Sequence, residues 1–124
     1  MKIKIYYEDT DCGGIVYHTN YIKYCERARS EKFFSLGLRP YENSNGFVVH
    51  SLEAHFLGSA TLGDEIDVST QVIQVKNVSI LLKQEIHKNQ NKIFEMEIKL
   101  GYINLKTHIP TPIPKHFLEV LNAK

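Results

Sequence analysis

The chain has 124 residues, of which 43% are hydrophobic and 23% are charged, and its formal net charge is +1. This length fits a single domain, residues 1–124, that buries about two-thirds of its unfolded surface. A charge so close to neutral creates no field that would attract nucleic acid or an acidic membrane surface, so we expect neither as a partner.

The ends of the sequence and its cysteines indicate a cellular compartment. The amino terminus, Met-Lys-Ile-Lys-Ile-Tyr-Tyr, lacks the apolar run of a secretory signal, and no segment has the length and hydropathy of a membrane span. Cys12 falls in a glycine-rich loop and Cys25 in an expected helix. Such unlike settings favour reduced thiols, so we expect a cytoplasmic protein.

The first predicted element is a strand. Residues 2–9 alternate polar with apolar side chains, a period of two that is typical of a strand with one buried face. Tyr7 would lie on the inner face of this strand. Gly13 and Gly14 follow closely, and paired glycines allow dihedral angles that other residues avoid. We therefore expect a turn after the strand.

The second predicted element is a long helix over residues 20–36. Its apolar residues fall near helical spacing. Thr19 or Asn20 is a suitable N-cap, and Gly37 is a natural stop. The helix would thus begin directly after the glycine turn.

Strands joined by turns are predicted for most of the remaining chain. Turns fall at residues 76–77 and 88–91, and such short turns require antiparallel neighbours. Three prolines form a stiff connector into an amphipathic tail, residues 115–121. The apolar or alternating runs that predict strands are residues 47–57, 66–72, 78–82 and 94–102.

One strand, one long helix and four further strands make an α+β domain. A single helix cannot cover two faces of a sheet, so we expect the five antiparallel strands to curl around it on one side. The remaining face and the sheet edges would then need the tail, solvent or a second subunit to cover them.

The segment between the first strand and the helix concentrates groups that can do chemistry. Asp11 lies two residues before the paired glycines, in the loop that leads into the helix. A helix N-terminus has unpaired N–H donors and a positive dipole end, so a carboxylate there can act on a carbonyl group as nucleophile or general base. The alternative is that Asp9 or Asp11 only caps a turn.

Three neighbouring side chains allow both a functional and a structural interpretation. His18, just before the helix, could position substrate or water, or could be a solvated surface ring. Tyr7 could direct its hydroxyl at the site, or could be a half-buried strand aromatic. Cys12 could be a nucleophile activated by the helix dipole, or an incidental small residue in the turn.

No metal or cofactor site is predicted. His50 and His55 are five residues apart on an expected strand, so they face opposite sides and make a poor metal pair. The sequence contains no CxxC, HExxH, P-loop or dinucleotide-binding glycine pattern. Ser79 has no sequence-near base that would suggest a triad. We therefore expect neither a metal ion nor a redox cofactor.

Residues 6–21, with the sequence YYEDTDCGGIVYHTNY, and residues 26–29, ERAR, closely resemble the signature of YbgC-type acyl-CoA thioesterases. These enzymes belong to the hotdog-fold superfamily, in the branch shared with 4-hydroxybenzoyl-CoA thioesterase. The match is dense over residues 6–31 and looser over nearly all of the rest. It implies a five-stranded antiparallel sheet wrapped around one long helix, an acyl-CoA substrate, and homodimers or homotetramers with sites at the interface.

The resemblance also implies roles for individual residues. The catalytic carboxylate of the family falls on Asp11, and the tyrosine and histidine of YbgC-type sites fall on Tyr7 and His18. The backbone donor that polarises the thioester carbonyl falls at the helix start, near His18. Contacts with the acyl-CoA substrate are implied at Gly14, Val16, Tyr17, Lys76 and Ser79.

Two other functions are open at this point. A binding module could hold acyl-CoA or an acyl carrier protein, or scaffold a lipid or envelope complex, without turnover. A hotdog hydratase or dehydratase would use a histidine with a differently placed acidic partner. The presence of Asp11, Tyr7 and His18 together favours the thioesterase, since a scaffold has no physical need for them. The residues do not specify the length or type of the acyl chain. They also do not decide whether Asp11 acts as nucleophile or as general base.

Overall fold

The computed structural model describes residues 1–123 and has one six-stranded sheet, two α-helices and a short 3-10 helix in that range. The strands are β1 (Lys2–Lys4), β2 (Tyr41–Glu42), β3 (Asn45–Phe56), β4 (Glu65–Val75), β5 (Ser79–Lys88) and β6 (Asn91–Asn104). The helices are α1 (Thr19–Phe34), α2 (Lys115–Asn122) and the 3-10 helix η1 (Tyr7–Asp9). Every strand pair is antiparallel, in the order β1-β4-β5-β6-β3-β2.

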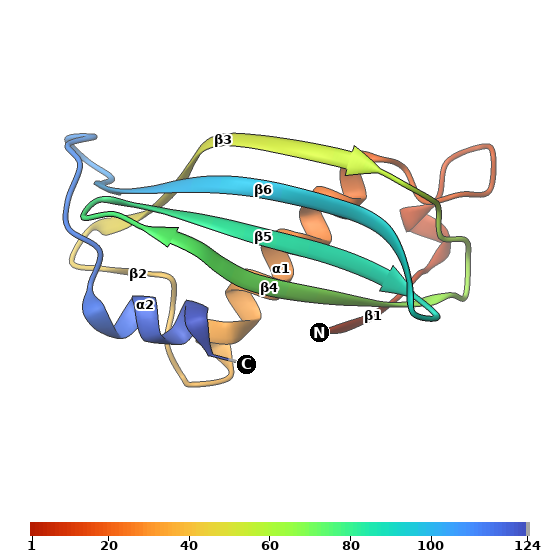
Figure 1. Cartoon of the computed structure of the whole chain (residues 1–124), viewed down its shortest axis with the longest axis horizontal. Helices are drawn as coiled ribbons and strands as arrows, with labels where there is room; N and C mark the ends of the chain where they lie inside the picture. Colours follow the sequence, from red (N-terminus) through yellow and green to blue (C-terminus); the bar gives the residue numbers. More distant parts are fainter. Residues whose placement is uncertain (124) are drawn as a thin grey trace.

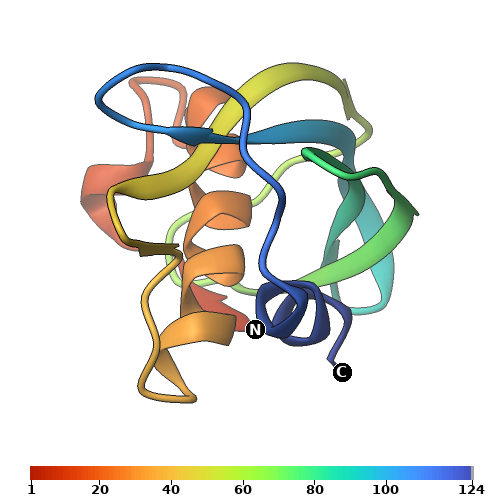
Figure 2. The ribbon, with the colours of Figure 1, turned by 90° about the vertical axis from the view of Figure 1, so that its left-hand side faces the viewer.

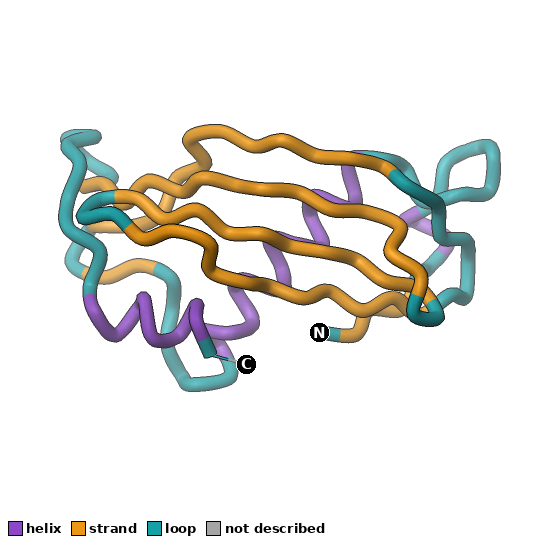
Figure 3. The backbone as a smooth tube through the Cα atoms, viewed as in Figure 1, coloured by secondary structure: helices purple, strands orange, loops and turns teal. Residues whose placement is uncertain are grey.

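The sheet curls around α1, which crosses it diagonally (Figures 1 and 2). Figure 3 shows the long strands as one layer in front of this helix. The predicted α+β arrangement, with a curled antiparallel sheet and one long helix, is therefore confirmed. The sheet has a sixth strand because β2 turns back onto β3, pairing Tyr41 with Gly46 and Glu42 with Asn45.

The helix prediction was correct to within two residues at its end. The helix α1 ends at Phe34, and Gly37 then adopts a φ of 72°, a left-handed conformation that suits glycine. The N–H of Leu38 returns to the carbonyl of Phe33 at 2.9 Å and closes the turn. Neither α1 nor α2 is long and apolar enough to cross a membrane.

The first strand was predicted too long. The strand β1 ends at Lys4, and the chain turns into η1 because the Asp9 carboxylate accepts a hydrogen bond from the Tyr6 N–H at 2.8 Å. The Asp9 N–H also donates to the Tyr6 carbonyl at 3.0 Å. Tyr7 is consequently 81% exposed and does not lie on an inner strand face.

One polar side chain is buried in the core, where it joins α1 to the sheet. Gln84 on β5 is fully buried and accepts a hydrogen bond from Arg29 Nη1 at 2.8 Å. Its Nε2 donates to the Cys25 carbonyl at 2.9 Å and to Thr70 Oγ1 at 3.0 Å. Burial also lowers the pKa of Arg29 from its ordinary value. Because Gln84 on β5 contacts two residues of α1 and one residue of β4, this network fixes the orientation of α1 on the sheet.

Candidate active site

The loop between η1 and α1 forms a small closed hairpin. Thr10 pairs with Val16, and the Asp11 N–H donates to the Ile15 carbonyl at 2.9 Å. The Gly14 N–H donates to the Asp11 carbonyl at 3.0 Å. Gly14 has a φ of 84°, which a residue with a side chain adopts only with strain. The hairpin therefore requires glycine at this position.

Asp11 is exposed and follows Thr10 directly in this hairpin. Its Oδ1 accepts a hydrogen bond from the Gly13 N–H at 2.8 Å, which makes an Asx turn. Within residues 1–123 no hydrogen bond reaches its Oδ2. Asp11 therefore caps the turn with one oxygen and keeps the other free for a substrate or a water molecule, so its structural and functional interpretations are compatible.

The N-terminal end of α1, called the helix mouth below, follows this hairpin and has unpaired N–H donors. His18 is the N-cap residue of α1, and its side chain does not cap the helix. The N–H groups of Tyr17 and Asn20 donate to the carbonyls of Asp9 and Tyr17, respectively. Among the described residues, no partner is found for the N–H groups of His18 and Thr19. These two donors lie at the positive end of the α1 dipole, where a developing oxyanion would be stabilised.

The His18 ring is exposed and faces aromatic neighbours. Its centroid lies 4.5 Å from that of Tyr17 and 6.1 Å from that of Phe56, at the end of β3. The Phe56 ring in turn lies 6.1 Å from Tyr21 and 5.2 Å from Phe94. The helix mouth is thereby connected to the end of β3 and to the core.

Tyr21 anchors the hairpin from inside the protein, a role that sequence reasoning missed. Its hydroxyl accepts a hydrogen bond from the Ala60 N–H at 3.0 Å, and the Ala60 carbonyl accepts one from the Val16 N–H at 2.9 Å. Burial raises the pKa of Tyr21. The sequence signal was a tyrosine on the buried face of the first helical turn, but only the fold shows which backbone group it meets.

Tyr21→Phe should therefore lower the free energy of unfolding by about 1–3 kcal/mol, because the buried Ala60 N–H would lose its acceptor. Urea denaturation measures this change. Tyr102→Phe is the matched control, since Tyr102 is 1% exposed and its hydroxyl has no hydrogen-bond partner among the described residues. Equal losses in the two variants would show that the Tyr21 hydroxyl does not anchor Ala60.

The other expected site residues near Asp11 differ in exposure. Gly14 and Tyr17 are exposed on the hairpin and at its end. The Val16 side chain is only 2% exposed, so it holds the hairpin to the core. Tyr7 lies directly before the hairpin, where its carbonyl accepts hydrogen bonds from both the N–H and the hydroxyl of Thr10.

Lys76 and Ser79 do not lie near Asp11 within one chain. They border the β4–β5 turn, where the Lys76 N–H donates to the Ser79 carbonyl at 2.8 Å and Ser79 pairs with Gly101 of β6. The helix mouth instead lies at the Phe94 end of β6 (Figure 1). The strand from Phe94 to Gly101 spans about 23 Å, at roughly 3.3 Å per residue. Within a single chain, Lys76 and Ser79 therefore lie at one end of the sheet, and the helix mouth lies at the other.

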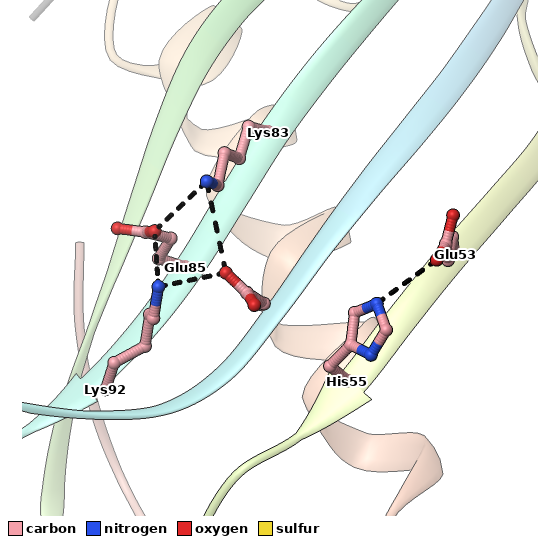
Figure 4. A network of polar contacts seen from close by, with 6 residues as sticks. Glu53, His55, Lys83, Glu85 and Lys92 are labelled. Carbon is pink, nitrogen blue, oxygen red and sulfur yellow. Dashed lines mark hydrogen bonds and ion pairs between the residues drawn. The ribbon is translucent and has the colours of Figure 1, made fainter.

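The outer face of the sheet carries a separate network of charges (Figure 4). Lys92 Nζ lies 3.2 Å from Glu85 Oε2 and 2.9 Å from Glu95 Oε2, and the hydrogen bond from Lys92 lowers the pKa of Glu95. His55 Nε2 lies 3.2 Å from Glu53 Oε1. In the range 1–123 no three His, Cys, Asp or Glu side chains are grouped so that they could hold a metal ion. The network is a set of mutually paired surface groups.

Comparisons with known proteins identify the family. The model of the "Thioesterase-like superfamily" matches residues 6–121. The chain belongs to this superfamily. It is 45% identical to the "Acyl-CoA thioesterase YbgC" of Helicobacter pylori, aligned over 99% of both chains. It is also 34% identical to the protein of the same name from Haemophilus influenzae, over 93% of this chain and 88% of that relative. The predicted YbgC-type resemblance is confirmed.

Solved structures share the same hotdog fold. A probable thioesterase from Bartonella henselae aligns with a TM-score of 0.85 and 23% identity, over 92% of this chain and 97% of that one. A 1,4-dihydroxy-2-naphthoyl-CoA thioesterase from Synechocystis aligns with a TM-score of 0.88 and 18% identity, over 98% and 93% of the two chains. At these identities the likeness establishes the fold alone.

Proposed function

We propose that this chain hydrolyses the thioester of acyl-coenzyme A to a free acid and coenzyme A. The observation that carries the proposal is the Asp11 carboxylate, which is held by its own turn with one oxygen free, in the loop that leads directly to the unpaired N–H groups of His18 and Thr19 at the start of α1. The relatives named acyl-CoA thioesterases, which align over nearly the whole chain, support the same activity.

In the proposed mechanism the thioester carbonyl lies between the carboxylate and the helix mouth. Asp11 attacks the carbonyl carbon, or removes a proton from a water molecule that attacks it. The N–H groups of His18 and Thr19 stabilise the negative charge on the carbonyl oxygen. The C–S bond then breaks, and coenzyme A leaves as a thiolate. If Asp11 is the nucleophile, the resulting mixed anhydride is hydrolysed by water.

The remaining site residues have supporting roles in this proposal. The His18 ring and the Tyr7 hydroxyl position the substrate or the water molecule. Gly14 and Tyr17 contact the substrate from the hairpin, and Val16 keeps the hairpin in place. This assignment is consistent with the exposure of each side chain, since only Val16 is buried.

Lys76 and Ser79 are proposed to bind the phosphate groups of coenzyme A. Ser79 lines a hollow together with His50 and Lys99, whose side chains can also carry positive charge. The β4–β5 turn lies at the end of the sheet opposite the helix mouth, so we propose that these residues bind a substrate whose thioester is held at Asp11 of a second copy. The proposal therefore requires a second copy of the chain.

The free edge of β3 is the surface through which we propose that two copies pair. The strand β2 pairs with β3 only at residues 45–46, so the remaining edge has no neighbour among the described residues. Val49, Leu52 and Phe56 on this strand are 54%, 41% and 49% exposed. Antiparallel pairing of two β3 edges would cover these apolar side chains and bring the β4–β5 turn of one copy toward Asp11 of the other. The assembly would be a homodimer, or a homotetramer made of two such dimers.

The domain organisation, the cellular compartment and a further partner are also part of the proposal. Residues 1–124 would act as one hotdog domain in the cytoplasm, where the free thiols of Cys12 and Cys25 would stay reduced. An acyl carrier protein is a further candidate partner, because its acyl group is attached through the same thioester bond.

The experiment that tests this function measures coenzyme A release from a panel of acyl-CoAs. Chromatography is the better detection, because the exposed Cys12 would itself react with thiol reagents. We expect release well above spontaneous hydrolysis for at least one acyl group, with no added cofactor, and a native mass of two or four chains. A stable complex with acyl-CoA that releases no coenzyme A would instead identify a binding module.

A further inference from the structure

Residues 60–64 form a short segment, the brace, that lies against the hairpin carrying Asp11. Thr61 of the brace pairs with Ile15 of the hairpin in an isolated antiparallel bridge. The carbonyl that precedes Thr61 accepts a hydrogen bond from the Val16 N–H at 2.9 Å. Because the Asp11 N–H in turn donates to the Ile15 carbonyl at 2.9 Å, the position of the brace affects where the backbone of Asp11 lies.

One carboxylate oxygen of Asp64 closes the brace into a turn. Asp64 Oδ2 accepts hydrogen bonds from the Thr61 N–H at 2.8 Å and from the Thr61 hydroxyl at 3.0 Å. The Asp64 N–H donates back to the Thr61 carbonyl at 3.1 Å. Asp64 therefore holds the conformation of the residue that pairs with Ile15 of the hairpin.

Lys88 connects this carboxylate to the sheet. Its Nζ lies 2.9 Å from Asp64 Oδ2, the same oxygen that Thr61 contacts. The Lys88 and Asp64 side chains are only 29% and 24% exposed, and the hydrogen bond from Lys88, followed by that from the Thr61 N–H, lowers the pKa of Asp64. The carboxylate thus stays ionised at neutral pH. Lys88 is the last residue of β5, at the end of the sheet where the loop before α1 also lies (Figure 1).

The brace is anchored from two sides. At Ala60 it is held by the buried Tyr21 hydroxyl of α1, at 3.0 Å, and at Asp64 it is held by Lys88 of β5. The Asp64 carbonyl also accepts a hydrogen bond from the Ile5 N–H at 2.9 Å. A single, partly exposed ion pair adds little to the stability of a whole fold. Its loss should therefore leave the brace attached but free to move at the end that contains Asp64.

Catalysis is more sensitive to such movement than folding is. A displacement of about 1 Å in a catalytic group can lower a rate by roughly 100-fold. We propose that Asp64, held by Lys88, is a positioning residue for the hydrolytic reaction, because it fixes the hairpin that carries Asp11 relative to the start of α1. The inference rests on the proposed function and goes beyond it, since it assigns an effect on the rate to an ion pair outside the candidate site.

Lys88→Met tests this role, because it removes the ion pair but leaves the hydrogen bonds between Thr61 and Asp64 possible. We expect kcat for coenzyme A release to fall roughly tenfold, with KM within about twofold of the wild type, since the groups that contact substrate are unchanged. Lys88→Arg should restore most of the rate, because a guanidinium also donates to a carboxylate. An unchanged kcat in Lys88→Met, or equal losses in Lys88→Met and Lys88→Arg, would overturn the inference.

Lys92→Met is the matched control. Lys92 lies in the same β5–β6 hairpin, is 34% exposed, and has its Nζ 3.2 Å from Glu85 Oε2 and 2.9 Å from Glu95 Oε2. This variant loses ion pairs of similar length and exposure from the outer face of the sheet, where they do not hold the brace. We expect it to keep the wild-type kcat. A loss equal to that of Lys88→Met would contradict a specific role for the brace.

A double variant tests whether Lys88 and Asp64 act as one unit. If Lys88 affects the rate only through Asp64, adding Lys88→Met to Asp64→Ala should lower kcat no further than Asp64→Ala alone. Losses that multiply in the double variant would show that Lys88 acts by another route, which would overturn the inference.

Amide hydrogen exchange detects movement of the brace and the hairpin independently of activity. In Lys88→Met the exchange of the Thr61 and Asp11 N–H groups should accelerate by roughly tenfold, and in Lys92→Met it should not change. Faster exchange with an unchanged kcat would overturn the positioning role, even with Asp11→Asn inactive and the proposed function intact. A fully active Asp11→Asn variant would instead remove the proposed function, and the positioning role with it. Thermal unfolding of each variant shows that the rates belong to folded protein.

Discussion

Asp11→Asn is expected to lower kcat by roughly 10³-fold or more while leaving the fold intact. Asparagine keeps the Oδ1 acceptor, so the hydrogen bond from the Gly13 N–H and the Asx turn can persist. It lacks the negative charge that makes the carboxylate a nucleophile or a base. The exposed side chain contributes little to core packing, so the melting temperature should stay close to that of the wild type.

Glu8→Gln is the matched control for this experiment. Glu8 is an exposed carboxylate three residues earlier, in η1, and no hydrogen bond or ion pair of its side chain is found in the described part of the chain. We expect it to retain wild-type kcat and KM when coenzyme A release is measured at several substrate concentrations. If Asp11→Asn turned over at a rate close to that of Glu8→Gln, Asp11 would have no role in the chemical step.

The largest loss of stability is expected for Phe94→Ala, at about 3–5 kcal/mol. The Phe94 side chain is fully buried, and its ring stacks on Tyr21 at 5.5 Å and meets Phe56 at 5.2 Å. Alanine would remove these contacts and leave a cavity between the first turn of α1 and the sheet. The free energy of unfolding in urea measures the loss.

Phe34→Ala makes the same chemical change at a surface position. Phe34 is the last residue of α1 and is 49% exposed, so its truncation should cost less than about 1 kcal/mol. A comparable loss in the two variants would mean that Phe94 is not part of the well-packed core described here.

Repeating patterns of apolar residues predicted most of the architecture. The alternation over residues 94–102 and the helical spacing before Gly37 both correspond to elements of the structure, because burial of one face constrains every second or every third to fourth residue. The short strand β2 was missed because two residues carry no periodicity. The first strand was extended too far because the hydrogen bond from Tyr6 to the Asp9 side chain overrides the alternation locally.

The candidate site was predictable where it is continuous in sequence. Asp11 and His18 belong to one short hairpin and the helix start that follows it, so their places on the loop and at the helix start follow from the local chain. The Tyr21 anchor and the separation of Ser79 from Asp11 depend on how distant strands pair, which local patterns do not determine.

The most direct measurement is a crystal structure of the assembly with a non-hydrolysable acyl-CoA analogue. We predict the carbonyl oxygen within hydrogen-bond distance of the His18 or Thr19 N–H, and the carbonyl carbon about 3–3.5 Å from an Asp11 oxygen or from a water bound to it. An analogue bound with its carbonyl remote from the helix mouth, and with the Asp11 carboxylate directed into bulk solvent in every subunit, would contradict the account.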